Sequence, residues 1–495
     1  MTKGPHGDEL TNLEVGQRIP FGGNRYTTVD RSLADAFCAG DRLIVVQETG
    51  DLIHVPAQVS RIVDEAVGEA RESSFVLPNV DSHAIASFFE VFGRMLEDDA
   101  TFASIADANA RDVESARERG RSVGRLELSP KMRTDMVAAL RMWRDLPITS
   151  DQAVDTIEHQ TWSVEERRAP LGVVAFIFEG RPNVFADATG VLRSGNSVVF
   201  RIGSDALGTA RAIMDSIVRP ALVSSGLPMG SVVLVDSPER SAGHALFSDR
   251  RVDLAVARGS GEAVAQLGAV ARQAGIPVSL HGTGGAWMLV EDGYPADRLS
   301  AIVDASLDRK VCNTVNVICL TRRDPDSLQA TLNGIHAASA RRHKKATVHC
   351  SASDRRSLEA VASEIRVDFS ISEHVDSDFM ALEWEWDEAP EVSIVLVDDL
   401  HHATDLFNRY SPQFIISVLS TDPAAVERVY LRSNAPFVGD GFTRWVDGQY
   451  ALGRPELGLS NWQSGRLFAR GGILSGDGVY SVRYLARHSD PTQRR

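Results

Sequence analysis

The residue with the clearest chemical potential in the sequence is the cysteine at position 312. Cys312 lies in DRKVCNTVNVICL, where a polar segment passes into an apolar run. A loop that enters a buried strand can present a reactive side chain to a cleft, and a thiolate in that place can act as a nucleophile. A cysteine beside a strand is more often a small buried hydrophobic residue, and this interpretation fits Cys38, Cys319 and Cys350. Cys312 alone therefore carries no functional conclusion.

A second candidate site is the turn Gly259-Ser260-Gly261, which follows a short apolar run and precedes a helical pattern. Small residues at the amino end of a helix let backbone N–H groups approach an anion such as a pyrophosphate. The bland alternative is an ordinary strand-to-helix turn, which is the more common meaning of an isolated Gly-Ser-Gly. The turn alone therefore does not indicate a binding site, and its interpretation depends on the flanking segments.

The elements that must position these residues alternate between apolar runs and helical patterns. In the first set, the predicted strands are 171–178, 197–201, 231–235, 254–256 and 278–280, with helices at 184–192, 209–223 and from 262 onward. In the second set, the predicted strands are 286–290, 315–320, 347–349, 392–397 and 414–419, with helices at 325–340 and 423–433 among them. Strands that are apolar on both faces predict parallel sheets covered on both sides. The fold class is therefore α/β, with two successive units and a cleft between them.

The part of the chain before residue 170 follows other patterns. Two short apolar runs, 42–47 and 52–55, flank Glu48-Thr49-Gly50-Asp51 and predict a β-hairpin. Residues 81–146 predict helices, one of which starts at Ser129 or Pro130. We expect an extension of unknown role over 1–65, a nucleotide-binding domain over 66–280, a catalytic domain over 281–440 and a returning C-terminal segment over 441–495.

Composition narrows the class of protein. The chain has 495 residues, which is too long for one hydrophobic core. Its hydrophobic content of 43% is sufficient to fill several cores. Its net charge of −15 argues against a nucleic-acid or anionic-membrane partner. Four irregularly spaced cysteines suggest neither a disulfide framework nor a metal site, and the polar amino-terminal residues do not suggest a signal peptide. We expect a cytoplasmic protein without a membrane anchor.

Four local segments, in order, resemble glutamyl phosphate reductase, a branch of the aldehyde dehydrogenase superfamily. They are PLGVVAFIFEGRPNV (170–184) with SGNSVVFR (194–201), ARGSGEAV (257–264), VCNTV (311–315), and GQYALG (448–453) leading to LFARGG (467–472). The resemblance runs from about residue 81 to 487. It implies an aldehyde dehydrogenase-like fold with two α/β domains and an oligomerisation arm.

The resemblance also implies a reaction. Cys312 would attack an activated acyl carbon, and the resulting thioester would accept hydride from NADPH to give an aldehyde. The oxyanion formed on attack needs hydrogen-bond donors, and the candidates are the Cys312 backbone N–H and the side-chain amide of Asn183. Alternatively, Asn183 merely caps the helix that follows it. Both interpretations stay open from the sequence.

The cofactor and the direction of the reaction have their own candidate residues. Arg201 and Ser204 end the SVVFR strand, where the superfamily contacts the adenosine ribose, and an arginine there favours NADP over NAD. VSLHGTGG (278–285) has His281 near the place where ordinary aldehyde dehydrogenases carry a glutamate base. Loss of that base argues against hydrolysis of the thioester to a free acid. His281 is otherwise a structural histidine of the turn.

An acyl phosphate substrate would need cationic partners. Arg181, Arg444 and Arg470 come from the matching segments or their neighbours and are candidates for substrate binding. Each has the alternative of an ordinary salt bridge. Two departures from the family pattern, Asn434-Ala435-Pro436 followed by GDGFTRW (439–445) and RYSPQF (409–414) without a histidine, fall where the family shapes its substrate pocket.

Two rival functions remain from the sequence. One is a reductase of a coenzyme A or carrier-bound thioester, and the other is a non-catalytic binding member of the family. The resemblance implies a homodimer or homotetramer, assembled through the arm at 156–168 and strands near 480–485. The extension is a candidate for a lid, an oligomer contact or a docking piece for a partner kinase or carrier protein.

Overall fold

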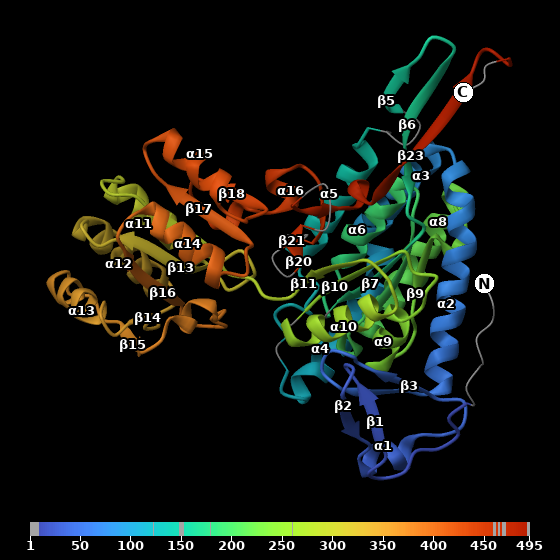
Figure 1. Ribbon diagram of the computed structural model, residues 1–495, viewed down its shortest axis with the longest axis horizontal. Coiled ribbons are helices and arrows are strands. Elements are labelled where there is room, and N and C mark those ends of the chain that lie inside the picture. Colours follow the sequence, from blue (N-terminus) through green and yellow to red (C-terminus); the bar gives the residue numbers. More distant parts are fainter. Residues whose placement is uncertain are drawn as a thin grey trace. The chain divides into compact units, whose positions relative to one another are not determined.

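The computed structural model describes residues 9–121, 123–147, 153–178, 180–259, 261–458, 462–463, 466–467 and 472–492. The chain divides into two compact units, and the secondary structure of both is drawn in Figure 1. Unit 1 comprises Met1–Gly282, Arg454–Gly458 and Leu474–Arg495, and unit 2 comprises Thr283–Gly453 and Leu459–Ile473. Residues 441–453, which we expected in a separate C-terminal segment, thus belong to unit 2. No helix in the described ranges is both long and apolar enough to cross a membrane.

Unit 1 is built on a parallel sheet, as predicted. Its strand order is β11-β10-β7-β8-β9. The strands are β7 (Val173–Phe178), β8 (Ser197–Ile202), β9 (Val232–Leu234), β10 (Leu254–Arg258) and β11 (Val278–His281). Every residue of β7 is buried, because successive side chains enter two different cores. Val174 and Phe176 pack in one core, whereas Val173 and Ala175 pack in the other.

Helices cover both faces of this sheet. The first core is closed by α3 (Ser82–Glu97), α4 (Asp99–Glu118), α5 (Pro130–Asp145), α6 (Val184–Ala188), α7 (Leu207–Ile213) and α8 (Arg219–Ser225). The second is closed by α2 (Ala57–Val76), α9 (Ser241–Phe247) and α10 (Gly261–Gln273). The predicted start of α5 is confirmed, because the Ser129 hydroxyl accepts a hydrogen bond from the Met132 N–H and Pro130 follows as the first helical residue.

The amino-terminal segment belongs structurally to unit 1. It contains β1 (Arg18–Phe21), β2 (Arg25–Thr28), α1 (Arg31–Ala36), β3 (Arg42–Val45) and β4 (Leu52–Val55). The predicted hairpin is confirmed as β3 paired with β4. The boundary that we expected near residue 65 falls inside α2, which runs unbroken from Ala57 because its buried face packs on the sheet. The Gln47 N–H donates to the Gln273 side chain of α10 at 3.1 Å, and this bond ties the segment to unit 1.

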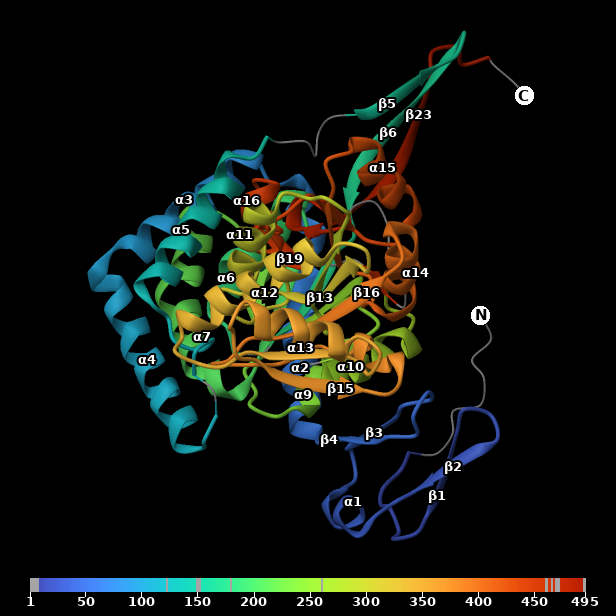
Figure 2. The same cartoon turned by 90° about the vertical axis from the view of Figure 1, so that its left-hand side faces the viewer.

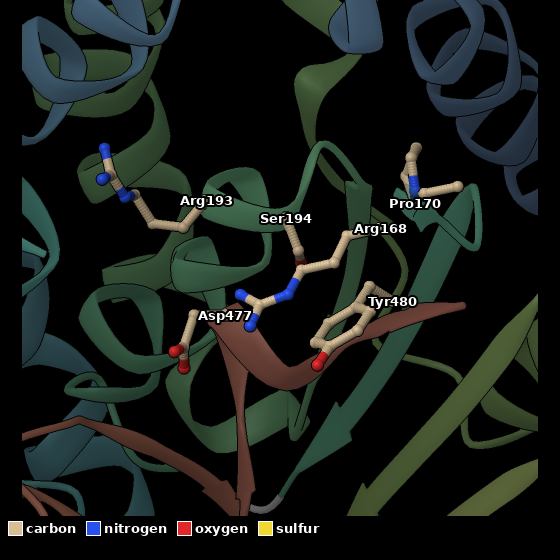
Figure 3. A pocket seen from close by; sticks show the side chains of 7 residues that line it. Arg168, Pro170, Arg193, Ser194, Asp477 and Tyr480 are labelled. Carbon is tan, nitrogen blue, oxygen red and sulfur yellow. The ribbon is translucent and has the colours of Figure 1, made fainter. Parts of the chain in front are cut away.

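A three-stranded antiparallel arm also belongs to unit 1. It consists of β5 (Ala153–Glu158), β6 (Trp162–Pro170) and β23 (Tyr480–His488), in the order β23-β6-β5. The arm stands away from the α/β body of unit 1 in both views (Figures 1 and 2). Its base encloses a cavity of about 20 Å³ lined by Arg168, Arg193, Asp477 and Tyr480, where the Arg168 guanidinium lies over the Tyr480 ring at 4.8 Å (Figure 3). The role of the arm in assembly stays a prediction.

Unit 2 contains a second parallel sheet of order β15-β14-β16-β13-β12-β17-β18. Its strands are β12 (Ala286–Val290), β13 (Val315–Thr321), β14 (Thr347–Ser351), β15 (Ser370–His374), β16 (Glu391–Val397), β17 (Ile415–Leu419) and β18 (Phe437–Gly439). Its helices are α11 (Ala296–Ser306), α12 (Pro325–Ala340), α13 (Arg355–Glu364), α14 (Leu400–Tyr410), α15 (Pro423–Arg432) and α16 (Gly448–Ala451). The expected α/β class is therefore confirmed in both units.

Candidate functional site

Cys312 lies in unit 2, in the loop between α11 and the amino end of β13. It is partly buried and packs against an apolar group that includes Ala286, Phe414 and Val446. Cys319 and Cys350 are fully buried, and burial raises the pKa of Cys350 to about 11 and that of Cys319 further. Neither thiol ionises readily at neutral pH, so the structural interpretation of these two residues agrees with their surroundings.

The Cys312 loop is held by hydrogen bonds of the Thr314 hydroxyl and of the backbone. The Val311 N–H donates to the Thr314 hydroxyl at 2.9 Å, and that hydroxyl donates to the Arg309 carbonyl at 2.6 Å. The Cys312 carbonyl accepts a hydrogen bond from the Gly285 N–H at 2.8 Å. These bonds fix the direction in which the chain passes through Cys312 before it enters β13. The nucleophile candidate is thus carried on an ordered turn.

The segment Gly284-Gly285 lies directly against this turn. A Cβ atom added at Gly284 would lie 2.7 Å from the Cα atom and 2.7 Å from the carbonyl oxygen of Cys312. Only a residue without a side chain allows the two backbones to come this close. Gly284 of the VSLHGTGG motif therefore has a definite role, which is to let the segment before β12 pass beside the cysteine.

Arg444 takes part in an ion pair, which is one of the two interpretations that the sequence left open. Its Nε atom lies 2.6 Å from Asp308 Oδ1, another of its nitrogens donates to Asn313 Oδ1, and its side chain is 12% exposed. The Asn313 side-chain amide in turn donates to the Val446 carbonyl at 2.7 Å. These contacts favour the salt-bridge interpretation of Arg444 over substrate phosphate binding. Asn313 follows Cys312 directly, so Arg444 contacts the residue next to the cysteine.

A second ion pair holds the other side of the same loop. Lys310 Nζ lies 2.5 Å from Glu383 Oε1, and Glu383 Oε2 accepts a hydrogen bond from the Gly284 N–H at 2.6 Å. Sequence reasoning missed both residues. Lys310 lies two positions before Cys312 and could have been noticed there, whereas Glu383 is remote in sequence and no local motif marks it.

Unit 1 gathers the other candidates at the carboxyl edge of its sheet. Arg201 lies in β8 opposite Ile177 of β7, Gly259 follows β10, and His281 ends β11 opposite Arg258. Arg181 and Asn183 follow β7. Ligands of parallel α/β sheets bind at this edge, so the structure brings five of the predicted residues to a suitable place. Ser204 lies close by in the chain, as the exposed first residue of the short 3₁₀ turn after β8.

The glycine turn packs closely on the end of β11. The Gly259 N–H donates to the His281 carbonyl at 3.2 Å, and a Cβ atom on Gly282 would lie 3.0 Å from the Gly261 Cα atom. Gly261 is the first residue of α10, so the helix begins where the strand β11 ends. Ser260 and Arg470 lie outside the described residues.

Asn183 is the residue before α6, but its side chain makes no capping hydrogen bond. Its amide nitrogen instead donates to Asp187 Oδ2 at 3.3 Å. Asp187 also lies 3.9 Å from Arg258, and Arg258 donates to the Glu456 carbonyl at 2.6 Å. The interpretation of Asn183 as a helix cap therefore lacks the hydrogen bond that it requires. Sequence reasoning missed both Asp187 and Arg258, although Arg258 lies inside ARGSGEAV and Asp187 lies three residues after the end of PLGVVAFIFEGRPNV.

The environment of His281 disfavours its charged form. Desolvation and the nearby positive charges of Arg258 and Arg181 lower the pKa of His281 to about 3, although part of the residue remains exposed to solvent. The ring is therefore neutral at physiological pH. A group with so low a pKa is also a weak base. This agrees with the expectation that the motif provides no efficient base for hydrolysis.

The lowered pKa of His281 makes a prediction about stability. The pKa of His281 in the unfolded chain is 6.5, so below this pH the unfolded chain binds a proton at His281 that the folded chain does not bind. The contribution of His281 to the free energy of unfolding is therefore fully present above pH 6.5 and is lost as the pH falls. Between pH 6.5 and 5.5 the free energy of unfolding of the parent protein should fall by about 1 kcal/mol more than that of a His281→Asn variant. Urea unfolding of both proteins at the two pH values measures this difference, and parallel losses would contradict a neutral His281.

Comparisons with known proteins agree with this architecture. Residues 49–323 match the model of the aldehyde dehydrogenase family. The gamma-glutamyl phosphate reductase of Escherichia coli O81 (strain ED1a) is 30% identical over 414 residues, which are 81% of this chain and 93% of that protein.

Solved structures show the same fold. The gamma-glutamyl phosphate reductase of Thermotoga maritima has a TM-score of 0.74 at 23% identity and covers 88% of this chain and 100% of its own. An acetylating aldehyde dehydrogenase from Geobacillus thermoglucosidasius has a TM-score of 0.61 at 13% identity, with coverages of 88% and 99%. The two-unit α/β architecture is therefore shared with both.

Proposed function

Because the chain belongs to the aldehyde dehydrogenase family and, within it, to the gamma-glutamyl phosphate reductases, we propose that it reduces an acyl phosphate to an aldehyde with NADPH. The protein is an oxidoreductase. The observation that carries the proposal is the placement of Cys312, a partly buried cysteine on an ordered turn that contacts Gly284 and Gly285 of the VSLHGTGG motif. The substrate is an acyl phosphate of the glutamyl phosphate type.

In the proposed reaction the Cys312 sulfur forms a bond to the acyl carbon, and the bond from that carbon to the phosphate oxygen breaks. Phosphate leaves with the bonding electron pair, and a thioester remains on the enzyme. A reduced nicotinamide held by the residues of unit 1 would supply the hydride for this thioester. The carbon–sulfur bond of the resulting thiohemiacetal would then break, releasing the aldehyde and the Cys312 thiolate. The Cys312 N–H and the Asn183 amide are the proposed donors to the oxyanion.

The residues of unit 1 fit a nicotinamide dinucleotide. The Arg201 Nε atom is buried without a hydrogen-bond partner among the described residues, and Arg201 donates to the Glu239 carbonyl at 3.1 Å. Burial, together with the charge of Arg240, lowers the pKa of Arg201, so an anion at this position would stabilise its charged form. The close approach of Gly282 to Gly261 leaves backbone without side chains at the amino end of α10. We therefore assign the 2′-phosphate of NADP to Arg201 and Ser204, and the pyrophosphate to the turn 259–261.

Replacement of Arg201 by alanine should change the cofactor preference. Loss of a charged hydrogen-bond donor to the 2′-phosphate is expected to raise the KM for NADPH about 10- to 100-fold while the KM for NADH changes little. Steady-state kinetics with both cofactors measure the ratio. Arg219→Ala is the matched control, because Arg219 pairs with Asp215 on the exposed surface. An equal rise for both cofactors would contradict the assignment of the 2′-phosphate.

The reverse reaction tests the proposed function directly. The purified protein is incubated with NADP⁺ and a panel of aldehydes that includes glutamate 5-semialdehyde, with phosphate, with coenzyme A or with neither, and NADPH formation is followed. Formation that requires phosphate supports the acyl phosphate reductase. Formation that requires coenzyme A instead supports a thioester reductase, and formation with neither would indicate oxidation to the free acid. Absence of NADPH in all three series supports a binding protein.

A further inference from the structure

Lys310 and Glu383 form a charge pair against the Cys312 loop that the proposed reaction does not itself use. We propose that the two are positioning residues for Cys312: the pair fixes the backbone around the sulfur and keeps the net charge beside it close to zero. The inference rests on the proposed function in taking Cys312 as the nucleophile. Its test, however, measures the reactivity of the thiol and requires no substrate.

One carboxylate joins the two segments that flank the cysteine. Glu383 Oε1 lies 2.5 Å from the Lys310 ammonium, and Oε2 accepts from the Gly284 N–H at 2.6 Å. The Lys310 side chain is 5% exposed and that of Glu383 is 14% exposed. Charge-assisted hydrogen bonds with so little solvent around them are strong and directional. Glu383 therefore acts as a bridge between the residue two positions before Cys312 and the glycine that lies against it.

The bridge reaches the cysteine through backbone contacts. Gly284 is so close to Cys312 that an added Cβ atom would lie 2.7 Å from the Cys312 Cα atom. The neighbouring Gly285 N–H donates to the Cys312 carbonyl at 2.8 Å. A shift of Gly284 relative to Lys310 would therefore move the backbone that carries the thiol.

Glu383 is itself held in place from both sides by one residue. The Asn316 side-chain nitrogen donates to the Leu382 carbonyl at 2.8 Å, and the Asn316 side-chain oxygen accepts from the Trp384 N–H at 2.9 Å. Asn316 lies in β13, the strand that Cys312 precedes. The carboxylate thus has a fixed position relative to the strand that begins after the cysteine loop. Such support from surrounding hydrogen bonds is what keeps a reactive group in a precise orientation.

A contribution to stability does not by itself account for a buried ion pair at this position. Removing two charges from water is unfavourable, and replacement of such pairs by apolar residues often leaves stability unchanged. The pair has a clearer consequence for charge. Lys310 is two residues from Cys312, so an unpaired ammonium there would favour the thiolate, whereas an unpaired Glu383 carboxylate would disfavour it.

Other charged groups around the loop would be unchanged in variants of Lys310 and Glu383. Glu385 lies 3.8 Å from the Lys310 ammonium and is exposed. Asp308 and Arg444 pair with each other on the side of Asn313. Arg309 is exposed and adjacent to Lys310. Because these groups are common to all variants, opposite shifts in two single variants can be assigned to Lys310 and Glu383.

The experiment measures the rate of Cys312 alkylation by iodoacetamide as a function of pH in the full-length protein. All variants carry Cys38→Ser, because Cys38 is exposed and would react as well, and a Cys312→Ala variant supplies the blank. Glu383→Gln should move the midpoint of the rate profile to lower pH and Lys310→Met should move it to higher pH, each by about half a pH unit. The double variant should return towards the parent midpoint.

Two further measurements keep the proposal falsifiable. Lys310→Arg retains the charge and should keep the parent midpoint, so the arginine and methionine variants of Lys310 suffice if Glu383→Gln does not fold. Circular dichroism reports folding in every case. Folded single variants whose midpoints shift in the same direction, or not at all, would overturn the proposal. Opposite shifts in a protein that turns over no aldehyde would support the charge pair and reject the proposed function separately.

Discussion

Replacement of Cys312 by alanine is expected to lower kcat at least about 10⁴-fold, because the proposed reaction has no covalent intermediate without the thiolate. The fold should be retained, since the side chain is only partly buried and sits at the edge of a small apolar group. Turnover of the acyl phosphate, or of the aldehyde in the reverse direction, measures the loss. Mass spectrometry of the parent protein after mixing with substrate in the absence of NADPH should show one acyl adduct, located on Cys312.

The matched control is Cys38→Ala. Cys38 is exposed in the amino-terminal segment of unit 1, and its replacement should leave kcat and the acyl adduct unchanged. A Cys312→Ala protein that keeps more than a few per cent of the parent rate would reject Cys312 as the nucleophile. An adduct on Cys38 in the parent protein would lead to the same conclusion.

A single methyl group at Gly284 should also lower the rate strongly, although less than the loss of the Cys312 thiol. The Cβ atom of Gly284→Ala would meet the Cα atom, carbonyl oxygen and Cβ atom of Cys312 at 2.7, 2.7 and 2.9 Å. Two of these atoms belong to the Cys312 backbone, whose carbonyl oxygen is hydrogen-bonded to the Gly285 N–H, so the cysteine must be displaced. A displacement of about 1 Å at a reacting group can cost about 100-fold in rate, and we expect kcat to fall by at least that factor.

Gly124→Ala provides the comparison for this prediction. No atom lies within 4 Å of a Cβ atom placed there, and its backbone does not require glycine. Its kinetics and its thermal unfolding should therefore match those of the parent. If Gly284→Ala kept the full rate, the ordered contact between the β12 entry and the Cys312 loop would have no part in catalysis.

The central strands of both sheets were predictable because their physical signal is local. Runs such as 173–178 and 315–321 are apolar on both faces, and this pattern is typical of strands buried in a parallel sheet. The strand β15 has the sequence SISEH and lies at a sheet edge, so it lacks the inner apolar run and was not predicted. The strand β18 has three residues, too few for a pattern. Helix α2 was missed because the extension that contains the predicted hairpin was expected to continue to residue 65, which lies inside this helix.

The side-chain partners of the site could not be predicted from the sequence. Arg444 was singled out because a substrate phosphate needs a cation, but the sequence does not reveal that Asp308 and Asn313 occupy its guanidinium. Glu383 is brought to Gly284 only by the packing of the segment before β16. Local motifs identify the type of chemistry, whereas the contacts that orient each group depend on residues far away in the sequence.

The interrupted course of unit 1 has a consequence for how the protein is made. Unit 1 consists of Met1–Gly282, Arg454–Gly458 and Leu474–Arg495. Its last strand, β23, pairs along its length with β6, which lies more than 300 residues earlier in the chain. A ribosome releases the chain in order, so β6 emerges long before its neighbour exists. Until β23 is synthesised, one side of β6 presents unpaired backbone groups that can pair with other nascent chains. The unpaired edge of β6 is thus a place where protection during translation would prevent pairing between chains.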